Sequence, residues 1–186
     1  SAFFLYGVAL IFGSTGSTKI SGIGAGLSGN ISIINTDAML LVGIGLLLVG
    51  LGFKVSAAPF HVWTPDVYEG APTPVTAFMA SAGKVAAFVA LLRILMVGLE
   101  QRADDWRPVV WALALLTVFT GSILAVVQTN VKRMLAYSSI SHAGFILVGV
   151  EAAGHMSGDG VATSMNYLAI YTVLVMGSFA IVLAMS

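Results

Sequence analysis

The sequence predicts an all-α integral membrane protein, a polytopic helical bundle of about six spans. Of its 186 residues, 58% are hydrophobic and only 9% are charged, and the mean hydropathy is +0.99. Soluble domains carry about 25% charged residues, so this chain could not cover a surface that faces water on all sides. The apolar residues also gather into long runs separated by short polar stretches, which is the pattern of successive spanning helices.

The composition argues against several classes of partner. The formal net charge is zero, so nothing suggests a nucleic acid or an acidic partner. There is no cysteine, which excludes disulfides and iron–sulfur ligation within this chain. The three histidines, His61, His142 and His155, lack the spacing of a structural zinc site. The glycine runs GIGAG and GIGLLLVGLG lack the strand–turn–helix context of a nucleotide site. We therefore expect no cofactor and no metal in this chain.

The apolar runs predict a single membrane domain over residues 1–186, with five complete spans and one partial span. The first run is shorter than the ~20 residues that cross a bilayer, and no methionine or basic leader precedes it. We therefore expect the chain to be part of a longer subunit. Residues 13–37 have the composition of a loop. The expected spans cover residues 1–12, 38–64, 74–98, 108–128, 134–150 and 161–185.

The second span contains a predicted break. Pro59 lacks a backbone donor and disfavours a straight helix, yet apolar residues continue to Trp63, before Pro65 and Asp66. The pattern predicts a broken helix with an irregular turn around Ser56 to Pro59. Such backbone is tolerated at membrane depth only where protein buries it or where it lines a wet cavity. Asp66 could form an entrance to that cavity or cap the helix that follows, and we favour the cap.

Lys84 lies near the centre of the third span, where a charged side chain is costly and rare. Its helical neighbours at positions 77, 80, 81, 87 and 88 are mostly small, so another helix can pack closely around the ammonium group. A lysine near a helix end would extend its side chain to the headgroups, but Lys84 is too far from either end. Because burial disfavours the charged form of an amine, we interpret Lys84 as a proton carrier.

Lys54, near the middle of the broken span, is the second candidate. On an unbroken helix it would share a face with His61, and the two would line a wet polar path across the break. The alternative is structural, with Lys54 donating hydrogen bonds to carbonyl groups that Pro59 frees. Both roles can coexist. Two lysines in adjacent helices disfavour each other's charged forms, which favours stepwise transfer between Lys54 and Lys84.

His142 lies in the motif SSISHAGF, one turn after Ser138 and Ser139. An imidazole titrates near neutral pH and can relay protons, and the two hydroxyl groups could order water beside it. The alternative is a core histidine whose ring is satisfied by a hydroxyl or a carbonyl group. His142 is therefore a third candidate for proton transfer.

Three stretches of the sequence carry a family resemblance. They are FKVSAAPFHVWTPDVYEGAPTPVTAF, SAGKVAAF and QTNVKRMLAYSSISHAGFILVG. Together they resemble the antiporter-like membrane subunits of respiratory complex I, above all the subunit N type of the bacterial NADH:quinone oxidoreductase, which has equivalents in the mitochondrial and chloroplast enzymes. The resemblance extends over almost the whole chain. It implies a fold of fourteen helices in two inverted repeats, of which this chain would be helices six to eleven.

The resemblance also implies roles for the candidate residues. Lys54 matches the lysine of the family's broken seventh helix and Lys84 the lysine of the eighth, both assigned to proton transfer. His142 matches the histidine of the tenth helix, between the two half-channels. Two further members of the family's path would lie outside this chain: a glutamate of the fifth helix and a charged residue of the twelfth.

The implied function is that of a non-redox subunit of a proton-translocating enzyme. Quinone reduction in other subunits would drive proton movement through the buried lysines here. NADH, FMN, iron–sulfur clusters and quinone are expected in those partner subunits. The expected partners are the other membrane-arm subunits, both antiporter-like and small hydrophobic ones, and the lipid bilayer. The resemblance places the chain in the bacterial plasma (inner) membrane, with the Lys132/Arg133 turn in the cytoplasm; the positive charges alone do not determine the orientation.

Other functions remain open at this point. A subunit of an Mrp-type Na⁺/H⁺ antiporter would share the helices and the lysines. A structural membrane spacer would tolerate a neutral residue in place of Lys84. An independent solute carrier would require a cavity lined by several polar groups, and the sequence offers few.

Overall fold

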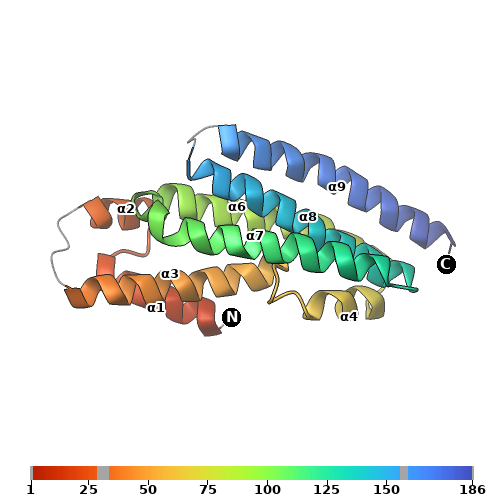
Figure 1. The fold of residues 1–186 in the computed structure, drawn as a ribbon, viewed down its shortest axis with the longest axis horizontal. Helices are drawn as coiled ribbons and strands as arrows, with labels where there is room; N and C mark the ends of the chain where they lie inside the picture. The colour runs from red at the N-terminus through yellow and green to blue at the C-terminus, as the bar shows by residue number, and fades with distance from the viewer. Residues whose placement is uncertain (1, 29–33, 156–158, 186) are drawn as a thin grey trace.

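The computed structural model describes residues 2–28, 34–155 and 159–185 and shows an elongated bundle of helices (Figure 1). These residues contain no strand, which confirms the all-α prediction. The helices η1 and η2 are π-helical and η3 is a 3-10 helix. In chain order the elements are α1 (Ala2–Thr15), α2 (Ile20–Ser28), α3 (Ile34–Val55), α4 (Trp63–Gly70), α5 (Thr73–Phe78), η1 (Met79–Gly83), α6 (Lys84–Arg93), η2 (Ile94–Gly98), η3 (Glu100–Arg102), α7 (Ala103–Val126), α8 (Val131–Ala153) and α9 (Asp159–Met185).

Five stretches of the described residues are long and apolar enough to cross a membrane. Helices α1 and α2, bent by 42° relative to one another, would count as a sixth span if taken together. The prediction of about six spans is therefore confirmed. The five stretches are Asp37–Val55, Thr73–Gly98, Glu100–Val126, Val131–Ala153 and Asp159–Met185.

The prediction of a loop over residues 13–37 is wrong in part, because α2 (Ile20–Ser28) lies within it. Ile23 and Leu27 recur at helical spacing and pack against the main hydrophobic core, and α2 contacts η2. A stretch rich in glycine thus forms a helix because tertiary packing outweighs its weak intrinsic helix propensity. Residues 29–33 of the expected loop lie outside the described residues.

Helix α7 also begins earlier than expected, at Ala103 rather than at residue 108. Pro108 lies inside the helix, where it removes the hydrogen bond to the carbonyl of Asp104. That carbonyl belongs to the first turn, beside a fully exposed Asp104 side chain, so water can replace the lost bond. Helix α8 starts at Val131 because Asn130 caps it, accepting hydrogen bonds from the backbone of Lys132 at 2.9 Å and Arg133 at 3.3 Å.

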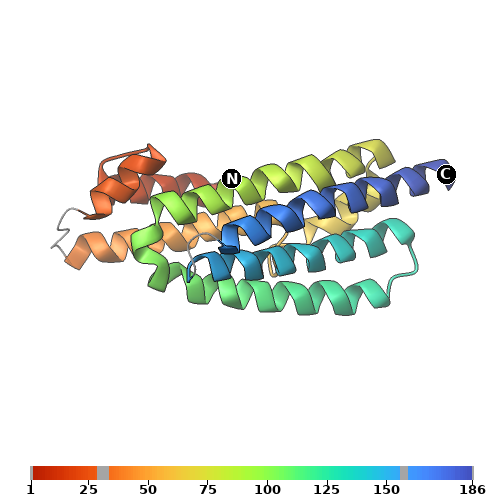
Figure 2. The same cartoon turned by 90° about the horizontal axis from the view of Figure 1, so that it is seen from above.

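Helix α8 contacts α4, α7 and α9, and Figure 2 shows α7 running alongside it. Gly121 and Gly144 allow this close approach. A Cβ atom at Gly121 would meet the backbone nitrogen of Ser141 at 2.4 Å, and one at Gly144 would meet that of Val118 at 2.7 Å. The packing of α7 fixes α8, and α8 in turn carries the polar residues described next.

The predicted break after α3 is confirmed. Helix α3 ends at Val55, and regular helix resumes at Trp63. Ser56, at the break, has φ of +64°, in the left-handed region that residues other than glycine rarely adopt, and the Ala58–Pro59 peptide is cis. The break lies inside the bundle, with Ser56, Ala57 and Ala58 all buried.

Candidate functional site

Lys84 is buried in the interior of the bundle, with a relative exposure of 2%. It is the first residue of α6 and directly follows the π-helical turn η1. Ala80, Ser81 and Phe88, on the same face, are buried with it, as the pattern of mostly small residues predicts. Lys84 therefore does not extend toward the membrane surface, and its ammonium group needs partners within the protein.

The partner of Lys84 is Ser139 of α8. The Lys84 Nζ donates to the Ser139 carbonyl oxygen at 2.6 Å and to the Ser139 Oγ at 2.5 Å. The Ser139 Oγ also shares a hydrogen bond of 2.7 Å with the hydroxyl of Tyr171 in α9. Tyr68 of α4 makes a side-chain hydrogen bond to Ser139 as well. Lys84 is thus joined to three other helices through one serine.

The ring of Tyr171 adds a second type of contact. Lys84 Nζ lies 5.9 Å from the centroid of this ring, a distance at which a cation and an aromatic face attract. Tyr171 and Tyr68 are both buried, and Phe179 packs edge-on against Tyr68 with 6.1 Å between centroids. The side of the Lys84 amine that faces α9 is therefore covered by a buried tyrosine ring.

His142 lies one turn beyond Ser139 on α8 and is half-buried. Its Nδ1 is 2.7 Å from the hydroxyl of Tyr167. Its ring is 5.2 Å from the ring of Tyr171 and 5.9 Å from that of Tyr167, measured between centroids. The Nδ1 atom thus has a hydroxyl partner, as expected for a core histidine. That partner, Tyr167, packs against the cluster that contains Tyr171 and Tyr68. We call Lys84, Ser139, Tyr171, His142 and Tyr167 the polar core.

Of the two serines beside His142, only Ser139 belongs to the polar core. Ser138 is half-buried, and its side chain has no hydrogen bond to another residue that the structure describes. The helical period explains the difference, because adjacent residues on a helix point about 100° apart. A different pair joins α7 to α8, with Ser122 Oγ and Ser141 Oγ 2.9 Å apart.

Lys54 has a different environment from Lys84. It lies in the last turn of α3, and its side chain is exposed. Within residues 2–28, 34–155 and 159–185 it makes no hydrogen bond or ion pair. The expected polar path from Lys54 to His61 is not formed by these residues. His61 is partly buried, with its ring 6.5 Å from that of Tyr137 and its Nδ1 unpartnered among the described atoms.

The break is stabilised by other side chains than Lys54. The backbone nitrogen of Ala58 donates to Thr117 Oγ1 of α7 at 2.9 Å. The indole nitrogen of Trp63 donates to the carbonyl of Phe53 at 3.1 Å. These bonds satisfy groups that an interrupted helix leaves without partners. The structural alternative for Lys54, donation to freed carbonyls, is therefore not seen; Pro59 itself is exposed.

Asp66 takes part in an ion-pair cluster at the turn between α7 and α8. Arg133 Nη1 lies 2.7 Å from Asp66 Oδ1 and 2.8 Å from Glu69 Oε2. Lys132 Nζ donates to the Glu69 carbonyl at 3.1 Å and to the Ala71 carbonyl at 2.7 Å. Asp66 also lies in the first turn of α4, where the helix dipole favours a negative charge. These contacts favour the structural role over the entrance.

A second ionic cluster lies at the other end of the bundle. Arg102 pairs with Asp37 of α3. Arg107 lies 3.4 Å from Glu151 of α8 and contacts the ring of His155, whose Nε2 is 3.0 Å from Glu151 Oε1. The first pair ties η3 to α3, and the second group ties α7 to α8 and to the residues just after it. They are partly exposed and separate from the polar core, so we assign them to packing.

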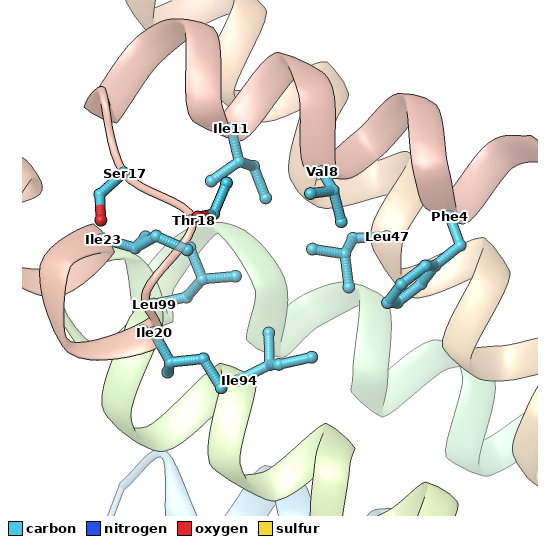
Figure 3. Close-up of a pocket in the computed structure, with 11 residues that line it drawn as sticks. Phe4, Val8, Ile11, Ser17, Thr18, Ile20, Ile23, Leu47, Ile94 and Leu99 are labelled. Carbon is cyan, nitrogen blue, oxygen red and sulfur yellow. The ribbon is translucent and has the colours of Figure 1, made fainter.

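The cavity shown in Figure 3 is lined mostly by apolar side chains, so it offers no row of polar groups along which a proton could move. Its volume is about 150 Å³, and it lies between α1, α2, α3 and η2. Apolar side chains such as Ile11, Leu47 and Ile94 form most of its wall, with Ser17 and Thr18 at the turn between α1 and α2. No group of three or more metal-ligating side chains is found among the described residues.

Sequence reasoning identified Lys84, His142 and Ser139 but missed the tyrosines around them. Tyr167 and Tyr171 lie four residues apart in NYLAIY, within an otherwise apolar span. Two hydroxyls on one face of a spanning helix were a usable signal, because buried tyrosines usually need a hydrogen-bond partner. Tyr68, in PDVYEG, gave no such signal, since the contact with Ser139 depends on how α4 packs.

The whole chain, residues 1–186, matches the family described as NADH:quinone oxidoreductase/Mrp antiporter, TM. NADH-quinone oxidoreductase subunit N of Mycobacterium tuberculosis H37Rv is 56% identical over 182 residues, covering 98% of this chain and 33% of the relative. Subunit N 3 of Streptomyces griseus is 52% identical over 190 residues, covering 98% and 34%. The chain spans about a third of the length of these curated relatives.

Solved structures share the fold. A chain of respiratory complex I from Thermus thermophilus with bound aureothin is 40% identical at a TM-score of 0.75, covering 97% of this chain and 36% of that one. A chain of the Mrp complex from Dietzia sp. DQ12-45-1b is 26% identical at a TM-score of 0.82, covering 96% and 31%. Both comparisons extend over nearly all of the bundle that holds the polar core.

Proposed function

Because the chain belongs to the NADH:quinone oxidoreductase/Mrp antiporter family of membrane subunits, we propose that it is part of a proton-translocating subunit of the membrane arm of NADH:quinone oxidoreductase. High identity to curated subunits N supports this choice within the family. In this proposal the chain moves protons, and its neighbours in the complex carry out the oxidation of NADH and the reduction of quinone. Those neighbours would be the other antiporter-like and small hydrophobic membrane-arm subunits.

The observation that carries the proposal is the burial of Lys84 within the polar core. Burial makes the charged form of an amine costly, so Lys84 can give up its proton. The Ser139 and Tyr171 hydroxyls, and the His142 imidazole one turn beyond Ser139, can receive a proton or pass it on. Intramembrane ionisable groups with such partners mark proton pathways in pumps and transporters.

His142 is the next carrier in this proposal. It lies beside Tyr171, which joins Ser139, and it is hydrogen-bonded to Tyr167. Lys54 is included on its match to the family motif. In the full-length subunit it would act with groups from outside the described residues, because those residues leave it exposed.

The wider setting follows from the same family. We place the subunit in the bacterial plasma (inner) membrane, with the Lys132/Arg133 turn on the cytoplasmic side. NADH, FMN, iron–sulfur clusters and quinone would be bound by partner subunits. In this arrangement the chain is a non-redox part of an enzyme, and protons leave the cytoplasm through it.

A second function is supported by the structural comparison. The TM-score is higher for the Mrp complex, 0.82, than for complex I, 0.75, whereas sequence identity is lower, 26% against 40%. A shared fold with an antiporter would let the same polar core serve Na⁺/H⁺ exchange. We favour the oxidoreductase because the identity to subunits N extends over 98% of the chain.

The test is Lys84→Ala in the full-length subunit within its assembled complex. NADH-driven quinone reduction and acidification of reconstituted liposomes are measured together, with assembly checked on a native gel. We expect both rates to fall by about tenfold or more, as loss of a proton-transfer group does. The matched control is Arg93→Ala, since Arg93 is an exposed cation on the same helix. Normal pumping by an intact Lys84→Ala complex would leave only the structural spacer.

A further inference from the structure

Two hydroxyl groups, of Ser139 and Tyr171, form a continuous hydrogen-bonded chain with the Lys84 amine. The distances are 2.5 Å from Lys84 Nζ to Ser139 Oγ and 2.7 Å from Ser139 Oγ to the Tyr171 hydroxyl. All three side chains are at most 3% exposed. The contacts are short enough for a proton to move along them without a large rearrangement.

The Ser139 carbonyl oxygen anchors the Lys84 end of this series of hydrogen bonds. It accepts from Lys84 Nζ at 2.6 Å, and a carbonyl can only accept. A neutral amine still has two N–H groups, so this bond can persist whether Lys84 is charged or neutral. The carbonyl therefore holds the Lys84 nitrogen in place. The adjacent Ser139 hydroxyl can act either as acceptor from the amine or as donor to it.

The Ser139 hydroxyl can be oriented in two ways. Beside a charged Lys84, which has no lone pair, Ser139 Oγ must accept from the ammonium and can donate to Tyr171. Beside a neutral Lys84, the Ser139 hydroxyl can donate to the amine lone pair while Tyr171 donates to Ser139 Oγ. Both atoms of the Ser139–Tyr171 contact can act as donor, so each protonation state of Lys84 is satisfied.

We propose that the Ser139 and Tyr171 hydroxyls relay the proton that leaves Lys84 toward His142. This inference rests on the proposed function. The Lys84 ammonium transfers a proton to Ser139 Oγ, and the hydroxyl proton of Ser139 moves to the Tyr171 oxygen. The hydroxyl proton of Tyr171 passes through a water molecule to the imidazole of His142. Lys84 becomes a neutral amine and His142 becomes charged, while both hydroxyls stay neutral.

The position of Tyr171 favours this direction of transfer. Its ring is 5.2 Å from the His142 ring and 5.9 Å from Lys84 Nζ, so it lies beside both groups. His142 Nδ1 lies 2.7 Å from the Tyr167 oxygen. In the tautomer whose Nδ1–H donates to this oxygen, Nε2 carries the lone pair that receives the proton. A hydroxyl that served only to satisfy Lys84 would have no need to lie against the second titratable ring.

The experiment uses the full-length subunit in its assembled complex, with NADH-driven quinone reduction and liposome acidification measured together. Tyr171→Phe removes one oxygen and keeps the ring; Ser139→Ala removes the other hydroxyl and keeps the carbonyl. We expect each to slow acidification by about tenfold or more. Ser139→Thr restores a hydroxyl and should recover most of the rate, which a purely steric effect of the Ser139→Ala change would not allow.

Ser138→Ala and Tyr137→Phe are the matched controls, since they delete hydroxyls of the same kinds on α8 outside the polar core. We expect both to pump at nearly the normal rate. If Ser139→Ala fails to assemble on a native gel, Tyr171→Phe decides the result. Normal acidification by an assembled Tyr171→Phe complex overturns the relay. When Lys84→Ala is inactive and Tyr171→Phe is normal, only the relay fails; when Lys84→Ala is normal, the proposed function fails as well.

Discussion

The surroundings of Lys84 and Lys54 differ although both lysines interrupt apolar spans of the same chain. Lys84 is 2% exposed and is hydrogen-bonded to Ser139. Lys54 is exposed, and the break next to it is satisfied by Thr117 and Trp63 instead. A charged residue in an apolar span is therefore only a candidate, and the helices packed around it decide whether its charge is buried.

The topology explains the difference. The segment η1–α6 is covered by α9, and Ser139 of α8 reaches Lys84 directly. The end of α3 that carries Lys54 also carries Phe53, which is 47% exposed. The described residues thus supply a complete environment for Lys84 and leave one side of α3 open. The chain spans about a third of the length of its curated relatives.

The largest difference between the two regions should appear between their histidines. We expect His142→Ala in the full-length subunit to slow acidification by about tenfold or more, and His61→Ala by about threefold or less. His142 lies within the polar core, whereas His61 Nδ1 has no partner among the described residues. Liposome acidification at equal amounts of assembled complex checks this prediction. Equal losses for the two variants would contradict the contrast between the regions.

A smaller difference is expected in stability, between two phenylalanines near the two lysines. Phe88 is 0% exposed and Phe53 is 47% exposed. Phe88→Ala should lower the free energy of unfolding by about 3–5 kcal/mol, because it leaves a cavity in the core, and Phe53→Ala by about 1 kcal/mol.

The measurement is unfolding of the full-length subunit in detergent micelles. If Phe53→Ala costs as much as Phe88→Ala, the Lys54 side is packed just as tightly in the complete protein. The difference in burial between Phe88 and Phe53 would then hold for residues 1–186 alone and not for the full-length subunit.

The smallest effect should come from the ion pairs that tie α4 to α8. Arg133 contacts both Asp66 and Glu69, so Asp66→Asn leaves one pair intact. We expect nearly normal acidification for Asp66→Asn and a modest loss for the double change with Glu69→Gln. The loss should be smaller at high salt, because salt already screens exposed ion pairs in the unchanged protein. A severe loss for Asp66→Asn alone would show that this carboxylate is an entrance of the path after all.

The fold was predictable because spanning helices have a strong signal in composition and length. Most expected spans begin and end close to the observed helices, but residues 38–64 run past the end of α3 at Val55 and across the break. The break at Pro59 was visible as a proline inside an apolar run. Helix α2 was not predictable, since its glycine-rich sequence becomes helical only through packing against η2. The start of α7 was missed because Pro108 can be accommodated next to a turn open to water.

The candidate site was only partly predictable. The central position of Lys84 and the small residues on its face indicated burial, which the structure confirms. The same reasoning did not reveal that the described residues leave Lys54 exposed, because exposure depends on neighbouring helices. Tyr171 and Tyr68 reach Ser139 from helices far away in the sequence. Such contacts depend on tertiary packing, which a single sequence does not specify.

The central claim, that Lys84 gives up its proton during turnover, is tested most directly by Lys84→Arg. Arginine keeps the positive charge and the donor groups but does not release a proton in proteins. In the assembled complex we predict that the ratio of protons pumped to NADH oxidised falls, or that both rates are lost, as for Lys84→Ala. A normal ratio at a normal rate would contradict the claim, because a permanently charged group would then be sufficient at this position.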